Sequence, residues 1–126
     1  MVRRTRADME QTRATLLETA RQVFSEHGYG ETSMDDLTAQ ANLTRGALYH
    51  HFGDKKGLLA AVIAQIDAEM DARLHAISDT ASDPWDGFRH RCRAYLEMAR
   101  EPEIQRIVLR DGRAVLGAPT PQAQLH

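Results

Sequence analysis

Apolar residues recur at helical spacing along nearly the whole chain, and this pattern constrains the fold most strongly. One clear example is the stripe formed by Leu16, Leu17, Ala20, Val23, Phe24 and His27. A repeat of three and four residues places side chains on one face of an α-helix. Aromatic residues make up only 6% of the 126 residues, and the abundant Ala, Leu, Arg, Glu and Gln are good helix formers. We therefore expect an all-α protein.

Capping and breaking residues predict where the helices begin and end. Ser33, Thr44 and Asp54 are suitable N-caps, and Gly28 is suited to end the first helix. Pro84 follows Asp83, as proline does at a first helical position. The predicted helices span about residues 9–27, 34–41, 45–51 and 55–77, a helix that starts at Pro84, and 103–110. We predict a loop over residues 78–83 and a loosely ordered tail after Gly117.

Residues 34–51 contain two short predicted helices joined by a tight corner. The corner reads Ala41-Asn42-Leu43-Thr44, and asparagine tolerates the left-handed backbone conformation that such a turn can require. Two short helices with a turn of three or four residues match the outline of a DNA-binding helix-turn-helix. This spacing alone is only moderately specific, because any tight helical hairpin would satisfy it.

The residues within this segment resemble those of the TetR (tetracycline-repressor-like) family of transcriptional regulators. The resemblance is carried by TSMDDL at 32–37, by ANLTRGALYHHF at 41–52 and by KKGLL at 55–59, and also by FSEHGY at 24–29. It is strong over about residues 10–60 and loose beyond them. Asn42 departs from the glycine that the family usually has in the turn, and Lys56 departs from a common acidic residue.

The resemblance implies that residues 45–51 form a recognition helix in the DNA major groove. Tyr49, Lys55 and either Thr32 or Ser33 match positions that hold DNA phosphates, and Gly46 matches a position where the backbone passes close to DNA. Arg45 and His50 are our candidates for reading base edges, since an arginine can bind guanine with two hydrogen bonds. The full predicted set of DNA-binding residues is Thr32, Ser33, Thr44, Arg45, Gly46, Ala47, Tyr49, His50 and Lys55.

The same resemblance implies a two-part organisation and a regulatory function. We expect a three-helix DNA-binding head with a basic N-terminal arm over residues 1–56, and a partial helical ligand-binding and dimerisation domain over 57–126. Leu37, Leu43, Leu48 and Phe52 match positions that pack the head. The expected function is sequence-specific binding of a double-stranded, palindromic operator, with repression relieved by a small-molecule effector.

Members of this family are usually longer than this chain. Their last two helices, which form the dimer interface, come after the point where the sequence ends. We therefore expect a member that is truncated at the C-terminus, and a homodimer where those helices are present or replaced. The alternative function is a helical interaction module that pairs with a full-length regulator and does not bind operator alone.

A stripe of aromatic residues lies on the predicted helix after Pro84. Trp85, Phe88, Tyr95 and Met98 are candidates for lining a ligand pocket, because the resemblance places effectors in this half of the chain. Packing in the core is the interpretation that we favour, for these residues and for Cys92 beside them. A third possibility is that the stripe remains uncovered and drives association.

Charge and composition restrict the other classes of function. The net charge of −2 argues mildly against nucleic-acid binding. Arg3, Arg4 and Arg6, however, form a basic arm, and basic residues cluster near the predicted recognition helix. A single cysteine, the lack of a signal sequence and the lack of a long apolar run favour a cytoplasmic protein that does not enter a membrane. We expect no cofactor, no metal site and no enzymatic activity, because no glycine-rich phosphate loop, metal-ligand spacing or nucleophile motif occurs.

Overall fold

The structure, a computed structural model, describes residues 5–117. This part of the chain is helical and contains no strand. The helices are α1 (Arg6–His27), α2 (Met34–Ala41), α3 (Arg45–Phe52), α4 (Lys55–Thr80), α5 (Pro84–Met98), the π-helix η1 (Ile104–Gly112) and the short α6 (Arg113–Leu116). The all-α prediction is confirmed. No helix within the described residues is long and apolar enough to span a bilayer.

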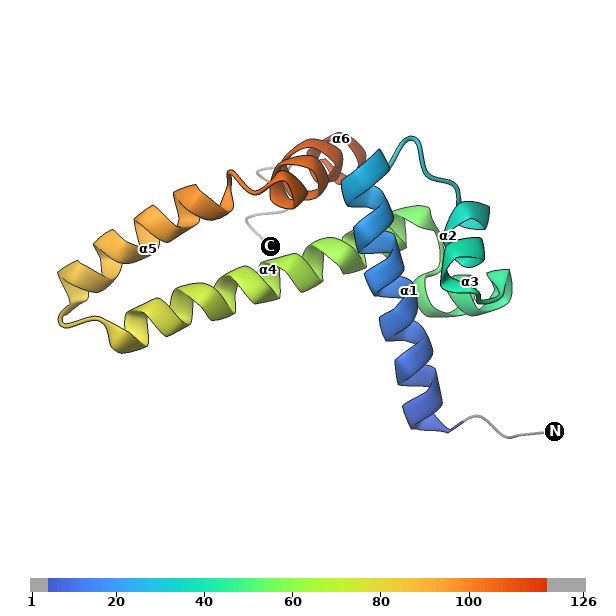
Figure 1. The fold of residues 1–126 in the computed structure, drawn as a ribbon, viewed down its shortest axis with the longest axis horizontal. Coiled ribbons are helices and arrows are strands. Elements are labelled where there is room, and N and C mark those ends of the chain that lie inside the picture. Colours follow the sequence, from blue (N-terminus) through green and yellow to red (C-terminus); the bar gives the residue numbers. More distant parts are fainter. Residues whose placement is uncertain (1–4, 118–126) are drawn as a thin grey trace.

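The helices form a compact head and a long hairpin that extends from it (Figure 1). In the head, α1 packs against α2, α3 and the first half of α4. The hairpin consists of the second half of α4 and the antiparallel α5, while η1 returns to lie against both α1 and α4. Because α4 is one continuous helix of 26 residues, it belongs to both regions, and the predicted domain boundary after residue 56 falls in its first turn.

Side-chain caps account for most of the helix starts. Ser33 Oγ accepts from the amide of Asp36, whose carboxylate accepts in return from the amide of Ser33, so the predicted capping box is present. Thr44 and Asp54 cap α3 and α4 as predicted. A second capping box, between Thr5 and Asp8, was missed, and it starts α1 at Arg6 rather than near residue 9.

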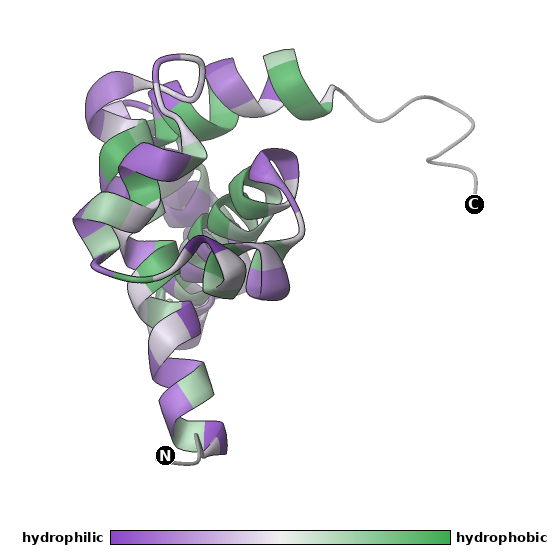
Figure 2. Cartoon of the chain, turned by 90° about the vertical axis from the view of Figure 1, so that its right-hand side faces the viewer, coloured by the Kyte–Doolittle hydropathy of each residue, from purple (hydrophilic) through white to green (hydrophobic). Residues whose placement is uncertain are grey.

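One continuous core runs from the head into η1. It contains the fully or nearly fully buried apolar side chains of Leu16, Leu17, Ala20, Val23, Phe24, Leu37, Leu48, Leu58, Leu59, Val62, Ile66, Met98, Ile104 and Ile107. Leu37 and Leu48 are each the buried apolar residue of their short helix, and Leu43 and Phe52 pack at the edge of the core. His27, which was predicted to continue the α1 stripe, is exposed. The N-terminal turns of α1 extend beyond the core (Figure 2), and residues 5–11 are all exposed.

The favoured interpretation of the aromatic stripe on α5 is wrong for three of its four residues. Trp85 is 69% exposed, and Phe88 and Tyr95 are about half exposed. Cys92 is also exposed. Met98 alone is fully buried.

A different face of α5 lies against α4, and two of its positions, Gly87 and Ala94, are small residues. Gly87 is buried, Ala94 packs against the core, and a Cβ atom on Gly87 would lie 3.2 Å from the Cβ of Ala81. The spacing of 87, 91, 94 and 98 places these positions on one helical face. Gly87 and Ala94 let the helices approach closely on this face, whereas Trp85 and Phe88 lie on other sides of α5 and are exposed.

The end of the chain also differs from the prediction. The helix predicted over 103–110 is a π-helix that continues to Gly112, followed by one turn of α-helix. Likewise α4 continues to Thr80, which shortens the predicted loop 78–83 to three residues. Arg3 and Arg4 of the predicted basic arm and the predicted loosely ordered tail lie outside the described residues.

Candidate nucleic-acid interface

The turn between α2 and α3 sets the relative position of these two short helices. Asn42 adopts the left-handed conformation, with φ of 55° and ψ of 43°. The amide of Leu43 donates to the carbonyl of Thr38 at 3.1 Å, which closes the corner. Thr44 then caps α3 by accepting from the amide of Ala47 at 3.1 Å. This local chemistry produces the helix-turn-helix geometry that the sequence predicts.

The face of α3 that points away from the core carries most of the predicted contact residues. Leu48 anchors the helix from the opposite side. Tyr49 is 42% exposed although it is a large aromatic residue. The exposed or half-exposed predicted residues of this face are Thr44, Arg45, Gly46, Ala47, Tyr49 and His50. The structure therefore leaves six of the nine predicted residues accessible along α3 and its N-cap, and we call the surface that they form the α3 face.

Arg45 is held on the α3 face by weak contacts. Its Nη2 lies 3.5 Å from Oδ1 of Asp35 in the first turn of α2. Its guanidinium carbon lies 5.9 Å from the centre of the Tyr49 ring, within the range of a cation–π contact. Both side chains of the ion pair are mostly exposed, so the pair contributes little to stability. The guanidinium can leave these contacts at small cost to bind another acceptor.

A shallow groove between α2 and α3 adjoins the α3 face. Thr38 and Ala39 of α2 line it together with Asn42, Leu43, Thr44 and Ala47. Sequence reasoning did not select Thr38 or Ala39, because nothing in the sequence shows which side of α2 faces this groove.

Two predicted phosphate ligands lie elsewhere. Thr32 is 3% exposed, and its hydroxyl donates to the carbonyl of Gly28 at 2.8 Å. Thr32 thus ties the α1–α2 loop to the end of α1, whereas the neighbouring Ser33 is exposed at the start of α2. Of the two residues proposed for this role, only Ser33 is accessible.

The ammonium group of Lys55 points toward the α1–α2 loop. Its Nζ donates to the carbonyl of Tyr29 at 2.6 Å and lies 4.0 Å from the centre of the Tyr29 ring. Burial lowers the pKa of Lys55, and the carboxylate of Asp111 partly opposes that effect. Lys56, next to it, is exposed.

The predicted ligand-binding residues do not share one site. Tyr95 lines a cleft between α4, α5 and η1, together with Met70, Leu74, Ile104, Val108 and other residues. Trp85 and Phe88 stack on each other, with ring centres 5.8 Å apart, and are not among the residues that line this cleft. Met98 is buried in the core.

Comparison with known proteins agrees with this arrangement. Residues 16–62 match the sequence profile of "Bacterial regulatory proteins, tetR family", and residues 85–126 match that of "Tetracyclin repressor-like, C-terminal domain". A TetR-family transcriptional regulator from Pectobacterium atrosepticum, known from a crystal structure, is 81% identical to this chain in sequence. The match covers 96% of this chain and 63% of the crystallised chain, with a TM-score of 0.84.

Two more distant proteins extend the comparison. The "Probable acrEF/envCD operon repressor" of Escherichia coli (strain K12) is 32% identical over 110 residues, which are 86% of this chain and 50% of that protein. A crystal structure described as a gamma-butyrolactone receptor is 30% identical, with a TM-score of 0.63, and covers 90% of this chain and 56% of its own. This chain thus spans about half the length of the curated relatives that it matches. By its two profile matches, its helix-turn-helix head and its similarity to a solved member, the chain belongs to the TetR family of bacterial regulatory proteins.

Proposed function

We propose that this chain is a sequence-specific DNA-binding transcriptional regulator. The observation that carries the proposal is the α3 face. There, polar and small side chains are exposed on a helix that Leu48 anchors from behind. A helix in this setting can enter the major groove, while α2 crosses the DNA backbone. Family membership supports the same function, because the similar Escherichia coli protein is named as an operon repressor.

Each part of the α3 face has a role in this proposal. Arg45 and His50 read base edges, and Gly46 and Ala47 let the helix backbone approach the groove closely. Tyr49 donates its hydroxyl to a phosphate, and Ser33 places the N-terminus of α2 near another phosphate. Thr44 keeps its hydroxyl on the amide of Ala47 and fixes the first turn of α3. Lys55 reaches a phosphate only if its ammonium group leaves the carbonyl and ring of Tyr29.

The finer part of the proposal is that the regulator is a repressor released by a small molecule. An effector would occupy the cleft between α4, α5 and η1, which is about 300 Å³ in volume. Its apolar lining, with Asp67 and Asp71 at the edge, suits an apolar effector that carries a polar or cationic group. The similarity to a protein described as a gamma-butyrolactone receptor supports small-molecule sensing. A dimer of the protein would then read a palindromic operator through two heads, and the effector would change their separation.

We assign the two functions to different parts of the chain. Residues 1–56 would act as the DNA-binding domain and residues 57–126 as part of the regulatory domain, with α4 joining them. Compounds that displace DNA from the wild-type chain should not displace it from the Leu74→Trp variant, because the larger side chain fills the effector cleft.

Fluorescence anisotropy with a labelled duplex from the region upstream of the gene tests DNA binding. The wild-type chain should bind this duplex more tightly than a scrambled one, with affinity that falls as salt rises. Arg45→Ala should weaken specific binding about tenfold or more. Arg89→Ala is the matched control, since Arg89 on α5 is equally exposed and also forms one ion pair with an aspartate. Equal affinity for both duplexes at low and high salt would argue against the proposal.

The exposed aromatic residues of α5 favour a second candidate function. Trp85, Phe88, Tyr95 and Leu96 are all at least half exposed, which is unusual for so many large apolar residues on one helix. A chain that binds no operator alone but forms a stable complex with a full-length regulator of the family would act as a helical interaction module. Size-exclusion chromatography of the mixture distinguishes this function from the first.

A further inference from the structure

A buried carboxylate of η1 holds the loop that leads from α1 to α2. Asp111 is 8% exposed, and its Oδ2 accepts from the backbone amide of Tyr29 at 2.9 Å. Its Oδ1 accepts from Nε of the neighbouring Arg110 at 3.0 Å. A hydrogen bond to a carboxylate is stronger than one to a neutral acceptor, because the acceptor is charged. The contact joins residues that are 82 positions apart.

Tyr29 connects this carboxylate to the start of α4. Its carbonyl accepts from Nζ of Lys55 at 2.6 Å and from the amide of Thr32 at 3.2 Å. Its ring lies 4.0 Å below the same ammonium and 5.6 Å from the ring of Phe24 in the core. Asp111 therefore holds Tyr29 through the amide, and Tyr29 holds Lys55 through the carbonyl and the ring.

Arg106 adds a second contact between η1 and the same region. Its Nη1 donates to the carbonyls of Ser25 and Glu26 at 3.1 and 2.9 Å. These carbonyls lie in the last turn of α1, where a positive charge is favourable. The end of α1 and the loop after it are thus both held by η1. This loop leads directly to Ser33, the N-cap of α2.

We propose that Asp111 is a positioning residue, which fixes the loop before α2 and the Lys55 ammonium and thereby sets how α2 and α3 are presented to DNA. This inference rests on the proposed DNA-binding function. η1 packs in the regulatory half of the chain and holds the loop before α2 through the carboxylate of Asp111, beside the contacts that Arg106 makes with the end of α1. A displacement of η1 that withdraws Asp111 releases Tyr29 and leaves Lys55 free to move.

Two substitutions separate the hydrogen bond to Tyr29 from the charge of Asp111. Asp111→Ala removes the acceptor, whereas Asp111→Asn keeps a side-chain oxygen that can accept from the Tyr29 amide. Asp79→Ala, at an exposed position near the end of α4, controls for the loss of a carboxylate. Hydrogen exchange of the peptide that spans residues 25–33 reports on the loop directly, and DNA anisotropy reports on the consequence.

In Asp111→Ala we expect exchange at the Tyr29 amide to rise about tenfold or more, while the Leu48 amide stays protected. Specific DNA affinity should fall about fivefold or more, because the head is no longer held in one arrangement. Asp111→Asn should restore most of both values, and Asp79→Ala should change neither.

Three results would overturn the proposal. The first is unchanged exchange at Tyr29 in Asp111→Ala. The second is a rise that is equal in the loop and at Leu48, which would indicate a purely structural role. The third is an Asp111→Asn variant that folds but loses affinity as fully as Asp111→Ala. If Asp111→Ala does not fold, Asp111→Asn alone decides: protection at Tyr29 and DNA affinity that stay together near their wild-type values, or fall together by a small amount, support the proposal. Wild-type exchange at Tyr29 with strongly lowered affinity contradicts it. Failure of the DNA-binding proposal is distinguishable, because it appears as the absence of operator preference in the wild-type chain.

Discussion

Nη2 of Arg45 lies 3.5 Å from Oδ1 of Asp35, so the first turn of α3 is paired with the first turn of α2. The same aspartate that pairs with Arg45 also adds negative charge beside the α3 face. We expect Asp35→Asn to raise DNA affinity about threefold, because it frees the guanidinium and removes a charge that repels phosphate. Anisotropy titrations at low salt measure this effect. Asp79→Asn, at the far end of α4, is the control, and an unchanged or lower affinity in Asp35→Asn would contradict the prediction.

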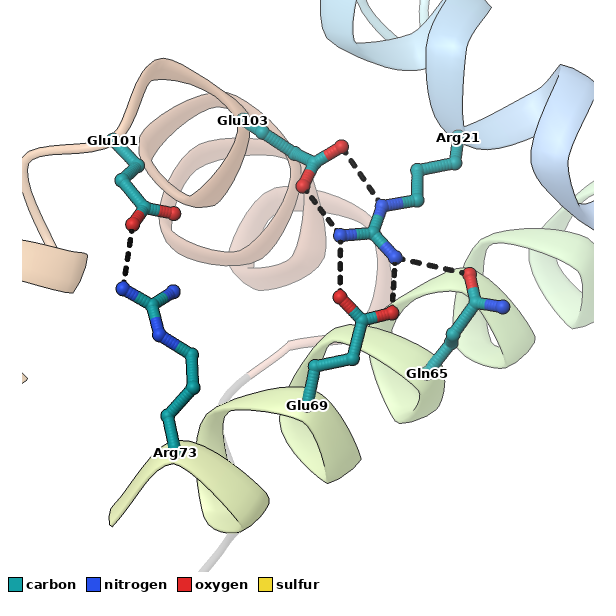
Figure 3. A network of polar contacts seen from close by, with 6 residues as sticks. All are labelled: Arg21, Gln65, Glu69, Arg73, Glu101 and Glu103. Atoms are coloured by element: carbon teal, nitrogen blue, oxygen red, sulfur yellow. Dashed lines mark hydrogen bonds and ion pairs between the residues drawn. The ribbon is translucent and has the colours of Figure 1, made fainter. Parts of the chain in front are cut away.

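Arg21 joins three helices through its guanidinium group (Figure 3). It donates two hydrogen bonds to Glu103 and two to Glu69, and one to Gln65. These partners raise the pKa of Arg21 above its usual value, chiefly because Arg21 donates hydrogen bonds to Glu103 and Glu69. We expect Arg21→Ala to lower the free energy of unfolding by about 1–3 kcal/mol, since the side chain is mostly buried and Glu103 loses its partner.

Arg73 provides the matched control for this substitution. It forms one ion pair with Glu101, in which both side chains are substantially exposed (Figure 3). Arg73→Ala should cost at most about 0.5 kcal/mol. Urea unfolding followed by circular dichroism measures the stability of both variants. Equal losses of unfolding free energy would show that the Arg21 network stabilises the protein no more than a surface ion pair does.

Glu69 should make part of the stability depend on pH. The hydrogen bond from Arg21 is the main cause that holds the pKa of Glu69 below its usual value of 4.5. A carboxyl group whose pKa is lower in the folded state stabilises the protein above its unfolded-state pKa, and that contribution is lost as the pH falls through the folded value. The stability difference between the wild type and Glu69→Gln should therefore be fully present at pH 7 and shrink as the pH falls below 4.5, the usual pKa of a glutamate.

The difference should be small, about 1 kcal/mol or less, because the Glu69 side chain is half exposed. Urea unfolding at several pH values measures it. A difference that stays constant down to pH 3 would show that the charge of Glu69 is not the cause.

Gly28 and Gly30 allow a matched test of the α1–α2 loop. Gly28 has a φ of 88°, and a Cβ atom there would lie 2.8 Å from Nη2 of Arg110. At Gly30 a Cβ atom would meet nothing within 4 Å. We expect Gly28→Ala to destabilise the protein by about 1–3 kcal/mol, because the backbone is strained and the Arg110 side chain must move.

Gly30→Ala should be neutral or slightly stabilising, because it restricts only the unfolded chain. Thermal unfolding compares the two variants. A Gly28→Ala protein as stable as Gly30→Ala would show that this loop rearranges without cost.

The helix boundaries in the head were predictable because their causes are local. Ser33, Thr44 and Asp54 each bond to an amide three residues ahead, and Asn42 closes the corner that its chemistry suits. The π-helical winding of η1 was not predictable, since apolar spacing near Ile104 and Ile107 is equally compatible with an ordinary α-helix.

The errors on α5 and at the interface have physical causes that lie outside local sequence. Hydrophobicity alone ranks Trp85 and Phe88 as core residues, but the side of α5 that meets α4 is the one with Gly87 and Ala94, where the backbones can approach closely. The burial of Thr32 and the direction of Lys55 both depend on how the α1–α2 loop folds back. The contact between Asp111 and Tyr29 spans most of the chain, and no pattern in the sequence marks it.

Leu48 is the buried residue of α3, whereas the rest of this eight-residue helix is exposed or lies at the edge of the core. Stability and surface chemistry are therefore assigned to different side chains of the same helix. Substitutions at Arg45, Ala47 or His50 can accumulate with little cost to folding, as exposed positions usually allow. In evolutionary terms, the proposed DNA-reading surface can change one residue at a time, without an intermediate that fails to fold.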